Sequence, residues 1–201
     1  AEFLARLRQA CTYPPQSGSD EDAVVRIQRH QIGHGSKRHQ IKQRGEIRFA
    51  GLRVRPLPAQ MRAGLEERLA QCNISFNDRR GTLRGMHYQA DPFPEAKLVR
   101  CTHGSIFDVV LDLRPGSPTY LAWRGFELTR TNRRALYVPA GCAHGFQSLE
   151  DETEVLYNMS EFFHPEQARG VRWNDPAFRI RWPLPQPILS ARDAGYPDFQ
   201  P

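Results

Sequence analysis

The sequence has no run of apolar residues long enough to cross a lipid bilayer as a helix, which takes about 20 residues. The first residues, AEFLARLRQACTYPP, lack the uninterrupted apolar core of a secretion signal. Both absences argue against a helical membrane protein. We therefore expect a cytoplasmic location and no membrane partner.

Cysteine pairs and metal-ligand spacings are also missing. No two cysteines form a CxxC pair, so the sequence signals neither a disulfide framework nor a zinc knuckle, and we expect reduced thiols. The scattered cysteines are Cys11, Cys72, Cys101 and Cys142. No HxH, HxxxH or EF-hand spacing supports a metal site at the four histidines of residues 59–201, so we expect no metal. These are His87, His103, His144 and His164.

Acidic residues are almost absent from one segment. Residues 26–55 hold nine Lys or Arg and the single acid Glu46, a charge of +8, whereas residues 1–25 carry −2 and residues 56–201 are neutral. The formal charge of +6 therefore comes from this segment alone. A basic arm could bind nucleic acid through phosphate contacts. Because the neutral remainder does not predict such binding, nucleic acid is not the partner we expect.

Residues 1–58 lack the periodicity of a helix or a strand. Between Arg26 and Arg48 the only apolar residues are four isoleucines among Gln, His, Arg and Gly. We expect this N-terminal extension to be disordered or poorly packed, and residues 59–201 to form the folded domain.

From residue 59 onward, short strand-like segments alternate with turn residues. The predicted strands are 71–76, 82–89, 97–102, 105–113, 120–129, 134–138, 144–149 and 153–159. Short strands at regular spacing predict an antiparallel sandwich or barrel rather than alternating βα units. The tail from residue 165 is rich in Pro and aromatic residues, and we expect it to wrap the barrel as loops and short helices.

The stretch 81–114 is the first candidate for a site. Arg84, His87 and Lys97 lie in segments that otherwise have the pattern of strands, and apolar strand faces rarely collect nitrogen-bearing side chains. Strict alternation would place Arg84 and His87 on opposite faces. If both serve one pocket, a β-bulge must intervene, and Gly85 is the residue that predicts it.

Several polar residues in the strands have a structural interpretation as well as a functional one. Tyr157 shares a face with apolar residues and could be a buried hydrogen-bonding phenol rather than an acid. The imidazole of His144 could form its hydrogen bonds with backbone groups near a turn. Lys97 could be a solvent-exposed lysine at the edge of a sheet. Asp108 and Asp112 fall on the polar face of their strand, where we expect them to be solvated or paired with arginine.

Seven segments carry a resemblance to a known family. In order along residues 69–199 they are GTLRGMHYQ, EAKLVRC, GSIFDVVLDLRPGSPTY, RRALYVPAGCAHGFQSL, TEVLYNMSEFF, RGVRWNDPAF and ILSARD. Together they resemble the dTDP-4-dehydrorhamnose 3,5-epimerase family. The resemblance implies an all-β cupin-type jelly-roll barrel, usually a homodimer, without metal or other cofactor. It implies that carbons 3 and 5 of a dTDP-linked 4-keto-6-deoxy sugar are inverted on the way to a rhamnose precursor.

The resemblance also implies which residues form the site. The family's general base corresponds to His87, its orienting carboxylate to Asp193, its proton donor to Tyr157, and the cation near the keto oxygen to Lys97. Arg84 corresponds to a diphosphate contact, and Phe163 to an aromatic residue that stacks on thymine. The whole set of implied substrate-binding residues is Gln71, Cys72, Asn73, Arg84, Lys97, His144, Phe163 and Arg192.

The implied chemistry needs these residue types. A hydrogen next to a ketone becomes removable when a fixed positive charge meets the developing enolate oxygen. A neutral imidazole can accept that proton, and a carboxylate on its other nitrogen fixes the tautomer. Inversion then requires a second proton source on the opposite face, for which a phenol is suited.

Other functions stay open at this point. A non-catalytic sugar-nucleotide-binding cupin could keep the same pocket, and a single-centre epimerase or ketoisomerase could use the same residues. Nucleic-acid binding through residues 26–55 would be salt-sensitive. A metal-dependent cupin oxygenase is disfavoured by the missing ligand spacing.

Overall fold

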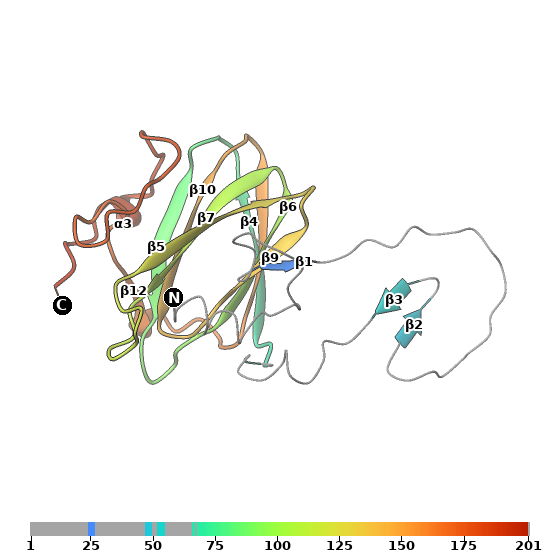
Figure 1. Ribbon diagram of the computed structural model, residues 1–201, viewed down its shortest axis with the longest axis horizontal. Coiled ribbons are helices and arrows are strands. Elements are labelled where there is room, and N and C mark those ends of the chain that lie inside the picture. The colour runs from blue at the N-terminus through green and yellow to red at the C-terminus, as the bar shows by residue number, and fades with distance from the viewer. Residues whose placement is uncertain (1–23, 27–46, 50–51, 55–65, 67, 201) are drawn as a thin grey trace.

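The computed structural model describes residues 24–26, 47–49, 52–54, 66 and 68–200 (Figure 1). Three short strands precede residue 66: β1 (Val24–Arg26), β2 (Ile47–Phe49) and β3 (Leu52–Val54). β2 pairs with β3, and β1 pairs with β9 (Arg134–Val138). Most of residues 1–58 lie outside the described residues, so the predicted disorder of this extension, and the domain boundary after it, stay predictions.

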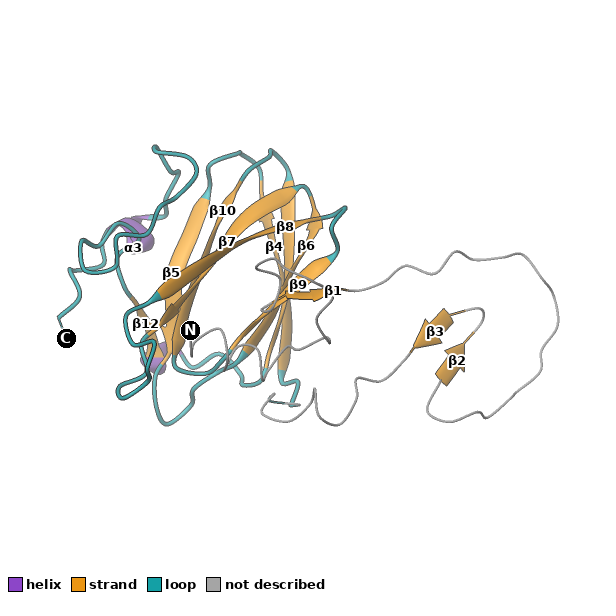
Figure 2. Ribbon diagram, viewed as in Figure 1, coloured by secondary structure: helices purple, strands orange, loops and turns teal. Residues whose placement is uncertain are grey.

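Two five-stranded antiparallel sheets make up the body of the protein (Figure 2). The first sheet has the order β1-β9-β6-β11-β4, and the second the order β12-β5-β10-β7-β8. Their remaining strands are β4 (Gln71–Asn77), β5 (Leu83–Gln89), β6 (Lys97–His103), β7 (Ser105–Asp112), β8 (Trp123–Thr129), β10 (Cys142–Ser148), β11 (Thr153–Met159) and β12 (Ala168–Gly170). Consecutive strands mostly cross from one sheet to the other, as in a jelly roll. The predicted all-β barrel is confirmed.

The predicted strand boundaries agree closely with the observed ones, and β8 is the largest exception. It begins at Trp123 instead of residue 120 because the preceding residues form turns. The backbone N–H of Tyr120 donates to the carbonyl of Ser117 at 3.0 Å. Leu121 has φ 63°, in the left-handed region that a strand cannot use.

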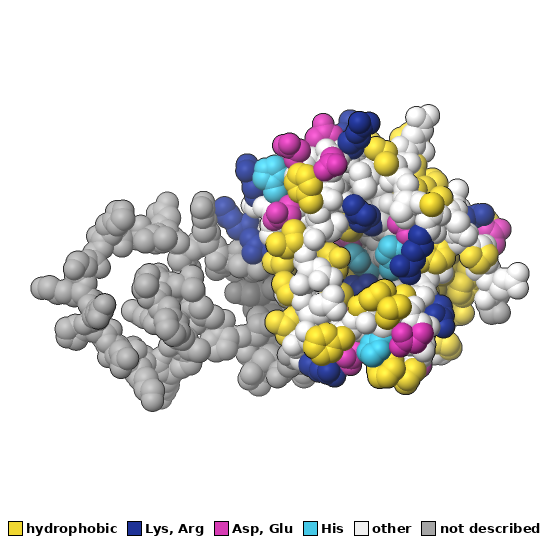
Figure 3. All heavy atoms as spheres, turned by 180° about the vertical axis from the view of Figure 1, so that it is seen from behind, with side chains coloured by type: hydrophobic (Ala, Val, Ile, Leu, Met, Phe, Trp, Pro, Cys, Tyr) yellow, Lys and Arg dark blue, Asp and Glu magenta, His cyan; other side chains and the backbone are white. Residues whose placement is uncertain are grey.

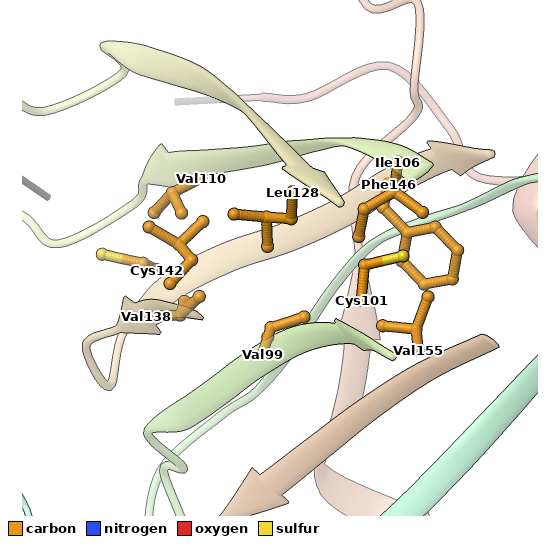
Figure 4. Close-up of a cluster of buried hydrophobic side chains, with 10 residues drawn as sticks. Val99, Cys101, Ile106, Val110, Leu128, Val138, Cys142, Phe146 and Val155 are labelled. Carbon is orange, nitrogen blue, oxygen red and sulfur yellow. The ribbon is translucent and has the colours of Figure 1, made fainter. Parts of the chain in front are cut away.

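The main core fills the space between the two sheets (Figure 4). Its buried residues alternate along the strands, as expected when one face of each strand packs on a core. They are Val99, Cys101, Ile106, Val110, Leu128, Leu136, Val138, Cys142, Phe146 and Val155. This cluster therefore defines which face of each strand looks into the barrel.

The C-terminal tail covers the outer face of the second sheet (Figure 1). Its ordered elements are η1 (Pro165–Gln167), β12 and α3 (Ala191–Ala194), so the predicted loops and short helices are joined by one unpredicted strand. A second apolar cluster joins sheet residues to tail residues: Met86, Val109, Leu111, Ala143, Val171, Phe178 and Ile180. β7 is consequently buried on both faces.

The outer face of the first sheet carries exposed apolar side chains instead. Ile74 and Phe76 of β4 are 62% and 54% exposed, and Leu98 of β6 is also exposed. No helix within the described residues has both the length and the apolar character needed to span a membrane.

Candidate active site

Strand β5 contains the bulge that its sequence predicts. His87 pairs with His144 of β10, but Arg84 pairs only two positions further along β10, so β5 gains one residue. Gly85 lies at this shift with φ 132°, and a Cβ atom there would lie 2.5 Å from the Cα of Gly145. Only glycine permits such an approach. Arg84 and His87 therefore share the inward face.

The inward faces of neighbouring strands collect most of the predicted site residues. Directly opposed residues on paired strands point to the same face, as do alternate residues along one strand. The register thus places seven predicted residues on the inward face of the barrel: Arg84, His87, His144, Lys97, Tyr157, Asn73 and Gln71. Tyr157 packs against the main core cluster. Figure 3 shows histidine side chains set into a hollow of one face, with Lys or Arg at its edge.

His87 is paired with the carboxylate that the resemblance implies. Its Nε2 lies 2.6 Å from Oδ1 of Asp193, although 106 positions separate the two residues. Helix α3 carries Asp193 and is capped by Ser190, whose Oγ accepts from the backbone N–H of Asp193 at 3.1 Å. The Asp193 side chain is 4% exposed and that of His87 is 34% exposed. The carboxylate is therefore sheltered while the imidazole stays within reach of a ligand.

The environment of Asp193 keeps its carboxyl group ionised. Burial by itself would raise the pKa of Asp193, but the hydrogen bond and charge of His87 oppose this effect. Hydrogen bonds from Ser190 and from the backbone of Gly85 act in the same direction, so the pKa of Asp193 lies below its usual value. An ionised carboxylate at Nε2 holds the ring proton there, and the neutral imidazole then presents Nδ1 as an acceptor.

A second carboxylate–imidazole pair lies on the same inward face. Nε2 of His144 is 2.5 Å from Oδ1 of Asp108, which is fully buried. The other oxygen of Asp108 has no hydrogen-bond partner among the described residues. The expectation that Asp108 is solvated or paired with arginine is wrong, because the polar face of β7 points into the barrel. For Asp112 the expectation holds, since Nη2 of Arg114 lies 2.8 Å from its Oδ2.

Lys97 is almost buried and ion-paired, so it is not a solvated edge lysine. Its Nζ lies 2.9 Å from Oε1 of Glu95, and both side chains are nearly inaccessible. β6 lies between β9 and β11, which explains why its first residue is covered. Glu95 is not among the residues predicted from the sequence. Its position two residues before Lys97, on the same side of an extended chain, was the available signal.

Gln71, Asn73 and Phe163 form one connected group. Nε2 of Gln71 donates to Oδ1 of Asn73 at 3.2 Å, and the backbone N–H of Phe163 donates to Oε1 of Gln71 at 3.1 Å. The phenyl ring of Phe163 is exposed. Cys72 is exposed between its two inward neighbours and faces the outside of the sheet, so the structure does not bring it into this group.

The two predicted arginines are exposed, and only some of their guanidinium N–H groups make hydrogen bonds within the protein. Nε of Arg84 donates to Oδ1 of Asn77 at 2.7 Å, and its Nη2 donates to the carbonyl of Phe76 at 3.4 Å. Nε of Arg192 donates to the hydroxyl of Tyr196 at 2.8 Å, and its guanidinium lies 5.9 Å from that ring's centroid. Each guanidinium keeps further terminal N–H groups that it can offer to phosphate oxygens.

Neither metal ligation nor a thiolate is indicated within the described part of the chain. No three His, Cys, Asp or Glu side chains converge there as metal ligands. Burial raises the pKa of the Cys101 and Cys142 thiols to about 12. Cys142 is therefore a protonated core residue near neutral pH rather than a nucleophile activated by His144.

Comparison with known proteins assigns the family. The model of a family described as dTDP-4-dehydrorhamnose 3,5-epimerase matches residues 57–201. The dTDP-4-dehydrorhamnose 3,5-epimerase of Sinorhizobium fredii is 45% identical over 132 residues, which are 65% of this chain and 68% of that protein. The dTDP-4-dehydrorhamnose 3-epimerase of Streptomyces niveus is 45% identical over 126 residues, 63% of this chain and 60% of that protein. The chain thus spans about two thirds of the length of these relatives.

A solved structure agrees with the sequence comparison. The dTDP-4-dehydrorhamnose 3,5-epimerase of Bacillus anthracis, with TDP and PPi bound, matches with a TM-score of 0.67 and 41% identity. The match covers 68% of this chain and 78% of that one. The fold, the sequence relatives and the family model agree, and the chain belongs to the dTDP-4-dehydrorhamnose 3,5-epimerase family.

Proposed function

We propose that this chain is a cofactor-independent isomerase that converts dTDP-4-dehydro-6-deoxy-D-glucose to dTDP-4-dehydro-L-rhamnose by inverting carbons 3 and 5. The observation that carries the proposal is the His87–Asp193 pair at 2.6 Å. It lies at the inward face that also carries Lys97 and Tyr157. Family membership supports the reaction type, and this geometry supports the roles of the residues.

His87 acts as the general base. Its Nδ1 accepts the proton from the carbon next to the 4-keto group, and Asp193 stabilises the imidazolium that forms. The electron pair of the broken C–H bond moves towards the keto oxygen, where the Lys97 ammonium stabilises the enolate. The phenol of Tyr157 then gives its proton to the same carbon from the opposite face. Water restores both protonation states, and the cycle repeats at the second carbon.

Binding of the nucleotide part is assigned to residues around this centre. Arg84 is suited to the diphosphate because a guanidinium can donate two parallel hydrogen bonds. Phe163 offers an exposed ring for stacking on the base. The TDP and PPi bound to the Bacillus anthracis relative support a ligand of this class. The further contacts proposed are Gln71, Asn73, His144 and Arg192.

Inversion of carbon 3 alone is the second candidate. It is favoured by the Streptomyces niveus relative, which is named a 3-epimerase and is as identical to this chain as the Sinorhizobium fredii 3,5-epimerase. The same base and acid would serve, and only the second cycle would be missing.

We also propose a cytoplasmic homodimer whose contact includes the outer face of the first sheet. Exposed apolar side chains gather there at Ile74, Phe76 and Leu98. Exposed large apolar side chains on one face of a sheet are typical of protein interfaces. A second copy of the chain is the occupant that the family resemblance favours.

Proton NMR of dTDP-4-keto-6-deoxyglucose in deuterated water tests the reaction. The wild type should replace the hydrogens at carbons 3 and 5 by deuterium and form the rhamno-configured product. Exchange at carbon 3 alone would assign the single-centre activity. Binding without any exchange would contradict an epimerase and identify a binding protein.

Two variants in the same experiment test the roles. His87→Ala should lose more than about a hundredfold in exchange rate, the usual scale of a general base. Tyr157→Phe should still exchange the substrate proton but fail to invert the carbon. Tyr120→Phe is the matched control, since this tyrosine is exposed outside the barrel. Normal exchange by the first variant, or full inversion by the second, would remove that residue from its role.

A further inference from the structure

The segment 162–164 is held by side chains of two strands although its phenyl rings are exposed. Gln89 of β5 makes three hydrogen bonds to loop backbone. Its Nε2 donates to the carbonyls of Phe93 at 2.6 Å and Phe162 at 3.1 Å, and its Oε1 accepts from the N–H of His164 at 2.8 Å. Gln89 is almost fully buried. One side chain therefore joins two loops at the end of β5.

The residue between these anchors is Phe163. Its own N–H donates to Gln71, so consecutive backbone groups from Phe162 to His164 are bound by glutamine side chains. The rings of His164 and Phe93 add a stacked contact, with centroids 3.9 Å apart and planes at 5°. An exposed aromatic residue is thus carried on backbone that has little freedom to move.

Gln89 also lies close to the reaction centre along the chain. It is two residues after His87 on β5, so it lies on the same inward-facing side of that strand. Fixing a recognition loop before the ligand arrives reduces the entropy lost on binding. Gln89 suits this role because it is buried and holds segment 162–164 through one donor and one acceptor while its other donor ties that segment to the Phe93 loop.

We propose that Gln89 is a positioning residue that holds Phe163 in place against the base of the nucleotide. The inference rests on the proposed function only in assigning Phe163 to the base. Gln89 itself touches no ligand and acts through the loop. Its loss should weaken nucleotide binding and raise KM, with little change in kcat at saturation, because the groups that transfer protons are unaffected.

Gln89→Met is the test variant, because methionine keeps the length of the side chain and removes all three hydrogen bonds. We expect the Kd of dTDP, measured by calorimetry, to rise about tenfold, which is about 1.4 kcal/mol. Amide hydrogen exchange of residues 162–164 should become faster. In a Phe163→Ala background the same substitution should add little, because the two residues act as one unit.

Gln147→Met is the matched control. Gln147 is also a buried glutamine that holds a loop, with its Nε2 donating to the carbonyl of Leu184 at 3.0 Å and its Oε1 accepting from the N–H of Leu184 at 2.9 Å. It should lower stability without changing the Kd of dTDP. Should Gln89→Met fail to fold, Gln89→Glu keeps the acceptor for His164 and loses both donors, with the same expected direction.

An unchanged Kd in Gln89→Met, an equal rise in the control, or a full additional effect in the Phe163→Ala background would each overturn the inference. Failure of the proposed function is distinguishable. Wild-type protein that binds dTDP but does not exchange substrate protons would sink the reaction and leave the role of Gln89 intact.

Discussion

At the residue scale, the two carboxylate–imidazole pairs differ in how much of each imidazole is accessible. The side chain of His87 is 34% exposed and that of His144 is 10% exposed, although each presents Nε2 to an aspartate. A base must reach a carbon-bound hydrogen of a bulky ligand, which suits the more accessible ring. The more enclosed ring is suited to hold a substrate group in place. The same two residue types therefore support different roles.

Residue contacts of this kind could be predicted only through the resemblance. His87 and Asp193 are 106 positions apart, and no spacing rule connects them. Asp108 shows what the alternation of apolar and polar residues along a strand cannot predict. Alternation placed it on the polar face of its strand, but the orientation of that face depends on the tail, which covers the opposite side.

Asp193→Asn tests the carboxylate behind His87. The amide keeps the shape of the side chain but cannot stabilise an imidazolium, so proton exchange should fall by at least about a hundredfold. Deuterium incorporation measured by NMR would show it. A variant that exchanges at the normal rate would leave His87 without a functional partner.

The same variant has a pH-dependent effect on stability. Because the pKa of Asp193 is lowered in the folded state, its ionised carboxyl contributes stability above its unfolded pKa, about 3.9. That contribution is lost as the pH falls through the lower, folded-state value. The difference in Tm between wild type and Asp193→Asn should therefore shrink as the pH falls below about 4. A difference that grows on acidification would contradict this sign.

At the element scale, period two predicts the eight strands from β4 to β11 but not β1, β2, β3 or β12, and the glycine at position 85 predicts the bulge in β5. Gly85 stands between two polar residues that could share a face only if β5 gained a residue, and the register shows that shift. Neither the late start of β8 nor the extra strand β12 could be predicted. The turn before β8 depends on backbone hydrogen bonds, and β12 exists because the tail reaches the edge strand β5.

Gly145→Ala tests the close approach of β10 to β5. A Cβ atom there would lie 2.7 Å from Sδ of Met86 and 2.9 Å from the carbonyl oxygen of Arg84. Overpacking of this kind should lower the free energy of unfolding by about 1–3 kcal/mol. Activity should fall as well, because the displaced strand carries His87. Urea denaturation and the exchange assay measure the two effects.

Gly116→Ala is the control for that substitution. Gly116 has φ 78°, but a Cβ atom there would have no other atom within 4 Å, so alanine brings backbone strain without a clash. It should lose some stability and keep full activity. Equal loss of activity in both variants would contradict the special role of the β5–β10 contact.

At the scale of the whole molecule, the two sheets differ in what covers their outer faces. The tail buries the outer face of the second sheet with residues such as Val171 and Phe178. In the described part of the chain the first sheet has no equivalent cover over Ile74 and Phe76. Composition predicts neither fact, because both depend on the path of the tail after β11. This asymmetry is what favours the first sheet as the contact between two copies.

Ile74→Lys tests that contact. A charged side chain in the centre of an apolar interface would have to be desolvated, so the variant should shift the protein from dimer towards monomer. Sedimentation velocity at several protein concentrations measures the shift. Ile188→Lys is the matched control, because Ile188 is also an exposed isoleucine but lies on the tail side, where it bridges to Thr82 beside the second sheet. If both variants dimerise as the wild type does, or if both dissociate alike, the outer face of the first sheet is not the dimer contact.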